Sequence, residues 1–138
     1  MILLDTNVLS EPLRPAPSQA VLDWLDAQEP ETLYLSTVSL AELLAGVQAL
    51  PASKRRTALR QAVAKQVLPL FSGRVLSFDE SAAEAFAQVH AAARRAGNPI
   101  SFPDCAIAAI AAANGYMVAT RNGRDFKGTG VTIVDPWV

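Results

Sequence analysis

Oxygen-bearing side chains occur at four places where a predicted strand ends or a predicted helix begins. Asp5 directly follows the apolar run 1–4, Glu42 lies early in the helix after the second strand, and Asp104 opens a later helix. The fourth place follows the fourth predicted strand and contains Thr120, Arg121, Asn122 and Asp125. In a parallel sheet, the carboxyl ends of the strands meet at one edge, where ligand crevices form. We therefore expect distant parts of the chain to bring their carboxylates toward Asp5.

Carboxylates gathered in this way repel one another unless a cation neutralises them. Hard oxygen ligands at a few positions, with room left for water and phosphate, suit Mg²⁺ or Mn²⁺. The chain offers no convincing histidine base, because its single histidine, His90, falls on the flank of a predicted helix. The residue types therefore indicate metal-centred chemistry.

Each acidic residue also has a purely structural interpretation. Asp5 could only cap the helical turn that follows it. Ser39-x-x-Glu42 matches a capping box, in which Glu42 would serve the helix start. Asp104 is a favoured first-turn acid beside a helix dipole. Asp125 sits in a loop with Gly and Arg, where an acid commonly supports a turn.

The elements that would position these residues alternate between strand and helix patterns. This alternation predicts an α/β layered domain with a mainly parallel sheet of about five strands. We expect strands over 1–4, 33–35, 75–78, 116–120 and 131–134. We expect helices over 18–27, 38–50, 54–71, 79–96 and 103–114, with only a short helical turn after Asn7.

The composition narrows the class of protein. With 138 residues, of which 51% are hydrophobic, the chain suits a single domain over 1–138. The net charge of −1 argues against a protein that holds nucleic acid by bulk charge alone. The single cysteine, Cys105, excludes an internal disulfide and a multi-cysteine metal site. The sequence shows no signal peptide or membrane span, so we expect a cytoplasmic protein.

Taken in order, the motifs resemble those of PIN-domain proteins, and more narrowly of VapC toxins near the FitB-like branch. The resemblance spans essentially the whole chain. It rests on MILLDTNVLS at the start, LAEL with Gly46, DCAIAA from Asp104, ATRN with Asp125-Phe126, and the closing DPW.

The resemblance implies a three-layer α/β/α domain and a Mg²⁺- or Mn²⁺-dependent endoribonuclease with one or two ions, usually a homodimer. It also implies a type II antitoxin partner that binds the toxin groove and, through its own DNA-binding domain, the promoter. The family's acidic set maps onto Asp5, Glu42 and Asp104. The fourth acidic position is Asn122 here, which brings no charge, so Asp125 is a candidate replacement. Supporting roles would fall to Thr6, Asn7 and Thr120, and contacts with the RNA backbone to Arg121, Arg124 and Lys127.

Two alternatives within the same fold stay open. One is a binding or regulatory module with weak or no nuclease activity, which the uncharged Asn122 permits. The other is an RNA-processing nuclease that works without an antitoxin. A dehalogenase-type phosphatase is disfavoured because it needs a second Asp where Asn7 stands, and a receiver domain because Asp5 comes too early.

Overall fold

One five-stranded parallel sheet organises the chain. The computed structural model describes every residue from Met1 to Val138. The strand order is β3-β2-β1-β4-β5, and all four neighbouring pairs are parallel. The strands are β1 Ile2–Leu4, β2 Leu33–Ser36, β3 Val75–Leu76, β4 Met117–Ala119 and β5 Ile133–Val134. The predicted parallel α/β sheet is confirmed, although its outer strands are shorter than expected.

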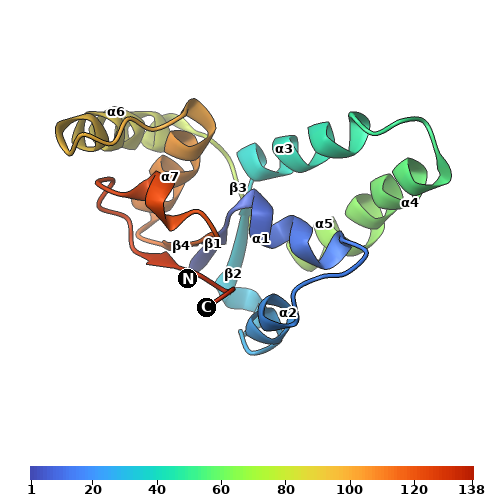
Figure 1. Cartoon of the computed structure of the whole chain (residues 1–138). Coiled ribbons are helices and arrows are strands. Elements are labelled where there is room, and N and C mark those ends of the chain that lie inside the picture. The colour runs from blue at the N-terminus through green and yellow to red at the C-terminus, as the bar shows by residue number, and fades with distance from the viewer.

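Helices cover both faces of this sheet, which gives three layers (Figure 1). They are α1 Thr6–Ser10, α2 Gln19–Asp26, α3 Thr37–Gln48, α4 Lys54–Ala62, α5 Leu68–Leu70, α6 Glu80–Arg95 and α7 Phe102–Asn114. Helices α3 and α4 form a hairpin that extends away from the sheet, whereas α6 and α7 pack together on the opposite side. No helix is long and apolar enough to cross a membrane.

Two apolar clusters hold the layers together. Leu3 and Leu4 point to opposite faces of β1, because side chains alternate along a strand. Leu4 joins the cluster beneath α1 to α5, and Leu3 joins the cluster beneath α6 and α7. Every residue from Cys105 to Ala111 is 0% exposed, so α7 is buried on all sides. Its alanines leave room for α6 and the sheet to come close.

The predicted helix starts are confirmed at α6 and α7. The Asp79 carboxylate accepts a hydrogen bond of 2.9 Å from the backbone N–H of Ala82 and so caps α6. The helix predicted from residue 103 begins one residue earlier, at Phe102. Pro103 therefore occupies the second position of the first turn of α7. Gly115 ends α7 with a φ of +71°, a left-handed conformation that favours glycine.

The capping-box interpretation of Ser39 and Glu42 is wrong. Helix α3 is capped by Ser36, whose Oγ accepts from the N–H of Ser39 at 3.0 Å. The pairing of β2 with β1 and β3 ends the strand at Ser36, so the helix begins at Thr37, one residue before its predicted start and one turn before the start that a Ser39 cap would give. Ser39 therefore lies inside the helix, and Glu42 has no capping role.

The helix predicted over 54–71 is also interrupted. A π-helical turn spans Val63–Val67, between α4 and α5. Pro69 explains this local widening, because its ring has no N–H and clashes with the carbonyl four residues earlier. As a result Leu70, which fitted the apolar period, is exposed, and Phe71 is buried instead.

Candidate active site

Asp5 occupies the carboxyl end of the central strand. The register pairs Leu4 with Ala119, so Asp5 lies beside Thr120 at the end of β4. The side chain is almost wholly buried, at 4% exposure. Its Oδ1 accepts from the N–H of Thr6 at 2.8 Å, and its Oδ2 accepts from Thr120 Oγ1 at 2.7 Å. One oxygen therefore caps α1, which confirms the structural interpretation, while the other oxygen faces Thr120.

Neutral donors fix the carboxylate of Asp5 in this position. The Asn7 side-chain amide donates to Asp5 Oδ2 at 3.3 Å, and Asn7 Oδ1 accepts from the N–H of Arg121 at 3.2 Å. Thr120, which is 0% exposed, accepts from the N–H of Asn122 at 3.0 Å. This network ties the end of β1 to the loop after β4, and it brings together the supporting residues expected from the sequence.

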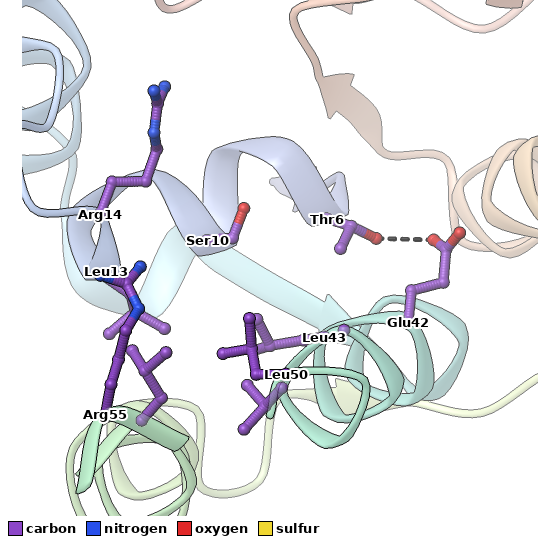
Figure 2. A pocket seen from close by; sticks show the side chains of 11 residues that line it. Thr6, Ser10, Leu13, Arg14, Glu42, Leu43, Leu50 and Arg55 are labelled. Carbon is purple, nitrogen blue, oxygen red and sulfur yellow. Dashed lines mark hydrogen bonds between the residues drawn. The ribbon is translucent and has the colours of Figure 1, made fainter. Parts of the chain in front are cut away.

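Glu42 reaches the same region from α3. The hydroxyl of Thr6 donates to Glu42 Oε1 at 2.7 Å, as Figure 2 shows. Thr6, the first residue of α1, directly follows Asp5, so Asp5 and Glu42 are connected through neighbouring residues of the chain. This contact spans 36 residues of sequence, and no local pattern could have revealed it.

Asp104 lies in the first turn of α7, where Ser101 Oγ accepts from its backbone N–H at 3.4 Å. Burial raises the pKa of Asp104, and the charges of Asp5, Asp125 and Glu42 raise it further. Burial likewise raises the pKa of Asp5, to which the charge of Glu42 adds. The four carboxylates therefore share one region of negative potential.

No basic side chain neutralises this cluster. The only ion pair in the chain joins Arg14 and Glu11, at 3.1 Å, away from the four carboxylates. No group of three Asp, Glu, His or Cys side chains is arranged to hold a metal ion directly. A divalent cation bound here would have to keep part of its water shell, as Mg²⁺ does. Asp5, Glu42 and Asp104 would be the residues that hold it.

This arrangement predicts that Asp104→Asn stabilises the metal-free protein. The raised pKa of Asp104 means that its ionised form costs folding free energy at neutral pH. In EDTA, we expect the variant to melt a few degrees above the wild type in calorimetry. With Mg²⁺ the wild type should gain more than the variant. Glu84→Gln, on the exposed face of α6, serves as the control and should behave like the wild type in both buffers. A variant that melts lower than the wild type in EDTA would contradict this account.

Arg121, Arg124 and Lys127 were expected to contact RNA. They lie beside the acidic cluster, and two separate sets of interactions hold them in place. The guanidinium of Arg121 stands 5.1 Å from the ring centre of Trp137, a cation–π arrangement that no local sequence pattern predicts. The backbone carbonyls of Arg124 and Lys127 accept from the Asn98 side chain at 3.3 and 2.8 Å. These bonds fix the loop of Arg124 and Lys127 against the connection between α6 and α7.

A groove leads away from Glu42 between α1, α3 and α4 (Figure 2). Its volume is about 270 Å³. Thr6 and Glu42 lie at one end, and Arg14 and Arg55 at the other. The rest of the lining is mainly apolar and consists of Leu13, Leu43, Val47, Leu50 and Leu59, with Ser10 and Gly46.

Comparison with known proteins places this geometry in a family. The sequence model of the PIN domain family matches residues 2–131. The chain belongs to the PIN domain family. It is 48% identical to VapC ribonuclease Y4jK of Sinorhizobium fredii over 99% of this chain and 98% of that protein. It is 44% identical to Toxin FitB of Neisseria gonorrhoeae over 99% of each. The solved FitAB structure bound to IR36 DNA superimposes with a TM-score of 0.96 at 43% identity, covering 100% of this chain and 96% of that one.

The PIN domain explains why the acidic residues come from separate elements. Strand β1, helix α3 and helix α7 each supply one carboxylate to the carboxyl edge of the sheet. Of the two candidates for a fourth ligand, Asp125 raises the pKa of Asp104, whereas Asn122 contributes its backbone N–H to Thr120. Asp125 is therefore the residue that extends the negative region.

Proposed function

We propose that this PIN domain is a Mg²⁺- or Mn²⁺-dependent endoribonuclease and the toxin of a type II toxin–antitoxin pair, acting on RNA in the cytoplasm. The observation that carries the proposal is the cluster of Asp5, Glu42 and Asp104, with which no basic side chain forms an ion pair. The names of its relatives, a VapC ribonuclease and Toxin FitB, support the reaction and the biological role.

Asp5, Glu42 and Asp104 would hold a divalent ion, which would supply Lewis-acid chemistry for the phosphate and the attacking water. The residues of the chain supply orientation. Thr120 and Asn7 fix Oδ2 of Asp5, and Thr6 fixes Glu42. The same neutral donors leave the negative charge of the cluster in place, and that charge favours the binding of a divalent cation.

The groove beside Glu42 is the proposed docking site of an antitoxin. Its apolar lining suits a protein segment, and any occupant that reached Glu42 would lie against the acidic cluster. We propose that contact with promoter DNA is made through the antitoxin; the similar FitAB was solved bound to a DNA fragment, which supports DNA binding by such a complex. We propose the homodimer as the working form on the same grounds of family membership.

Metal dependence is the direct test of the reaction. We expect the purified protein to cleave bacterial RNA in Mg²⁺, to stop in EDTA and to resume when Mn²⁺ replaces the lost ion. Sequencing of the new RNA ends would identify the substrate. Unchanged turnover in chelator would refute the metal-dependent mechanism, and no cleavage under any metal would favour the binding module that Asn122 permits.

A further inference from the structure

The charge of this chain is strongly divided along the sequence. Residues 43–78 contain no Asp or Glu but six basic residues. Because the whole chain has a net charge of −1, the remainder sums to −7. The basic residues of this segment are Lys54, Arg55, Arg56, Arg60, Lys65 and Arg74. The small net charge of the whole chain therefore conceals a basic segment that begins at α4 and an acidic remainder that includes the carboxylate cluster.

Most of these cations have no structural partner. Lys54, Arg60 and Lys65 are exposed, and none forms an ion pair. Arg56 and Arg74 are the exceptions. The guanidinium of Arg56 donates to the carbonyl of Leu50 at 3.3 Å and holds the turn before α4, and that of Arg74 donates to the carbonyls of Leu33 and Leu70. The free cations are thus available to a ligand from solution.

Helix stability does not account for them either. Lys54 and its two basic neighbours fill the first turn of α4, which contains no acidic residue. The helix dipole favours anions at this end and disfavours cations there. Because these cations disfavour the helix that carries them, their presence at this end of α4 needs another explanation.

The position of α4 supplies one. Helix α4 packs on α3, the helix that carries Glu42. Arg55 on α4 and Glu42 on α3 line the two ends of a single groove (Figure 2). A polyanion lying on α4 would therefore extend toward the acidic cluster, which on its own repels phosphate.

We propose that the exposed face of α4 and of the π-helical turn after it, formed by Lys54, Arg60 and Lys65, binds the phosphate backbone of the RNA substrate and delivers the strand to the carboxylates. This inference rests on the proposed ribonuclease activity. The face carries Ala58 and Gln61 between its cations and no large apolar side chain. It lacks the aromatic and aliphatic anchors of protein interfaces, so it suits a nucleic-acid backbone better than an acidic protein.

The test compares two variants that lose the same charge. Lys54→Gln/Arg60→Gln removes two cations from α4 but leaves Arg55 in the groove. Arg94→Gln/Arg95→Gln removes two exposed cations from the last turn of α6. The probe is a short single-stranded RNA that contains the mapped cleavage site, with KM and kcat measured at constant Mg²⁺ over a series of KCl concentrations.

We expect the α4 variant to raise KM about tenfold at moderate salt, and to lower the slope of log affinity against log salt by about 1.4, with kcat unchanged. The α6 variant should match the wild type. Equal affinity and slope in the α4 variant and the wild type would overturn the inference while wild-type cleavage left the proposed function standing. If the α4 variant instead kept its RNA affinity but lost its complex with the antitoxin, the face would belong to a protein partner.

Discussion

Asp5→Asn should reduce metal-dependent RNA cleavage by about 100-fold or more, because metal catalysis at this site needs the carboxylate charge. The substitution keeps the size of the side chain, and Asn caps a helix as well as Asp does. The bond from the N–H of Thr6 can therefore remain. The loss should appear in the initial rate of cleavage at saturating Mg²⁺, with the melting temperature in EDTA showing that the domain is still folded.

Asp79→Asn is the matched control for this variant. Asp79 also caps a helix, α6, with the same kind of bond from a backbone N–H. It does not contribute to the raised pKa of Asp5 or Asp104. Activity should therefore survive at Asp79→Asn and disappear at Asp5→Asn. Full activity of Asp5→Asn in a preparation free of other nucleases would refute the proposed role of Asp5 in metal-dependent cleavage.

Thr120→Val should lower cleavage by about 10- to 100-fold, the usual cost of removing a hydrogen bond that orients a metal ligand. Thr120 is a positioning residue, because its hydroxyl acts through Asp5 Oδ2 at 2.7 Å. Valine keeps the shape of the buried side chain but donates nothing. The Mg²⁺ concentration that gives half-maximal activity should rise, which a purely structural role would not cause.

Two further variants make this result interpretable. Thr120→Ser keeps the hydroxyl and should restore most of the activity. Thr129→Val removes a hydroxyl that is also buried but donates to the carbonyl of Phe126, at 2.6 Å. Thr129→Val should lose stability without changing the Mg²⁺ requirement. A normal Mg²⁺ requirement in Thr120→Val would show that Asp5 needs no help from Thr120.

Much of the fold could be predicted because the signals are local. The apolar run before Asp5 predicted β1, and Asp79 and Gly115 marked a helix start and a helix end that the structure confirms. Local signals failed where two residues could serve equally well. Ser36 and Ser39 both suit a helix cap, and the choice between them depends on where β2 stops pairing with its neighbours.

The site was harder to predict than the fold. The types of residue at Asp5, Glu42 and Asp104 suggested a metal site, but each also had a structural explanation. The contacts at the site are long-range. Thr120 donates a hydrogen bond to Asp5 across 115 positions of sequence, because β4 pairs with β1. The stacking of Arg121 on Trp137 likewise depends on how the chain end folds back. Such pairings follow from the sheet register and not from neighbouring sequence.

The burial of α7 has a consequence for the dynamics of Asp104. From Cys105 to Ala111 the helix has no contact with solvent, so its backbone amides can exchange with water only when the domain opens as a whole. Asp104 stands in the first turn of this helix and is anchored to its slowest-exchanging part. We expect local unfolding at the surface to leave the carboxylate of Asp104 in place, so that its separation from Asp5 requires global unfolding.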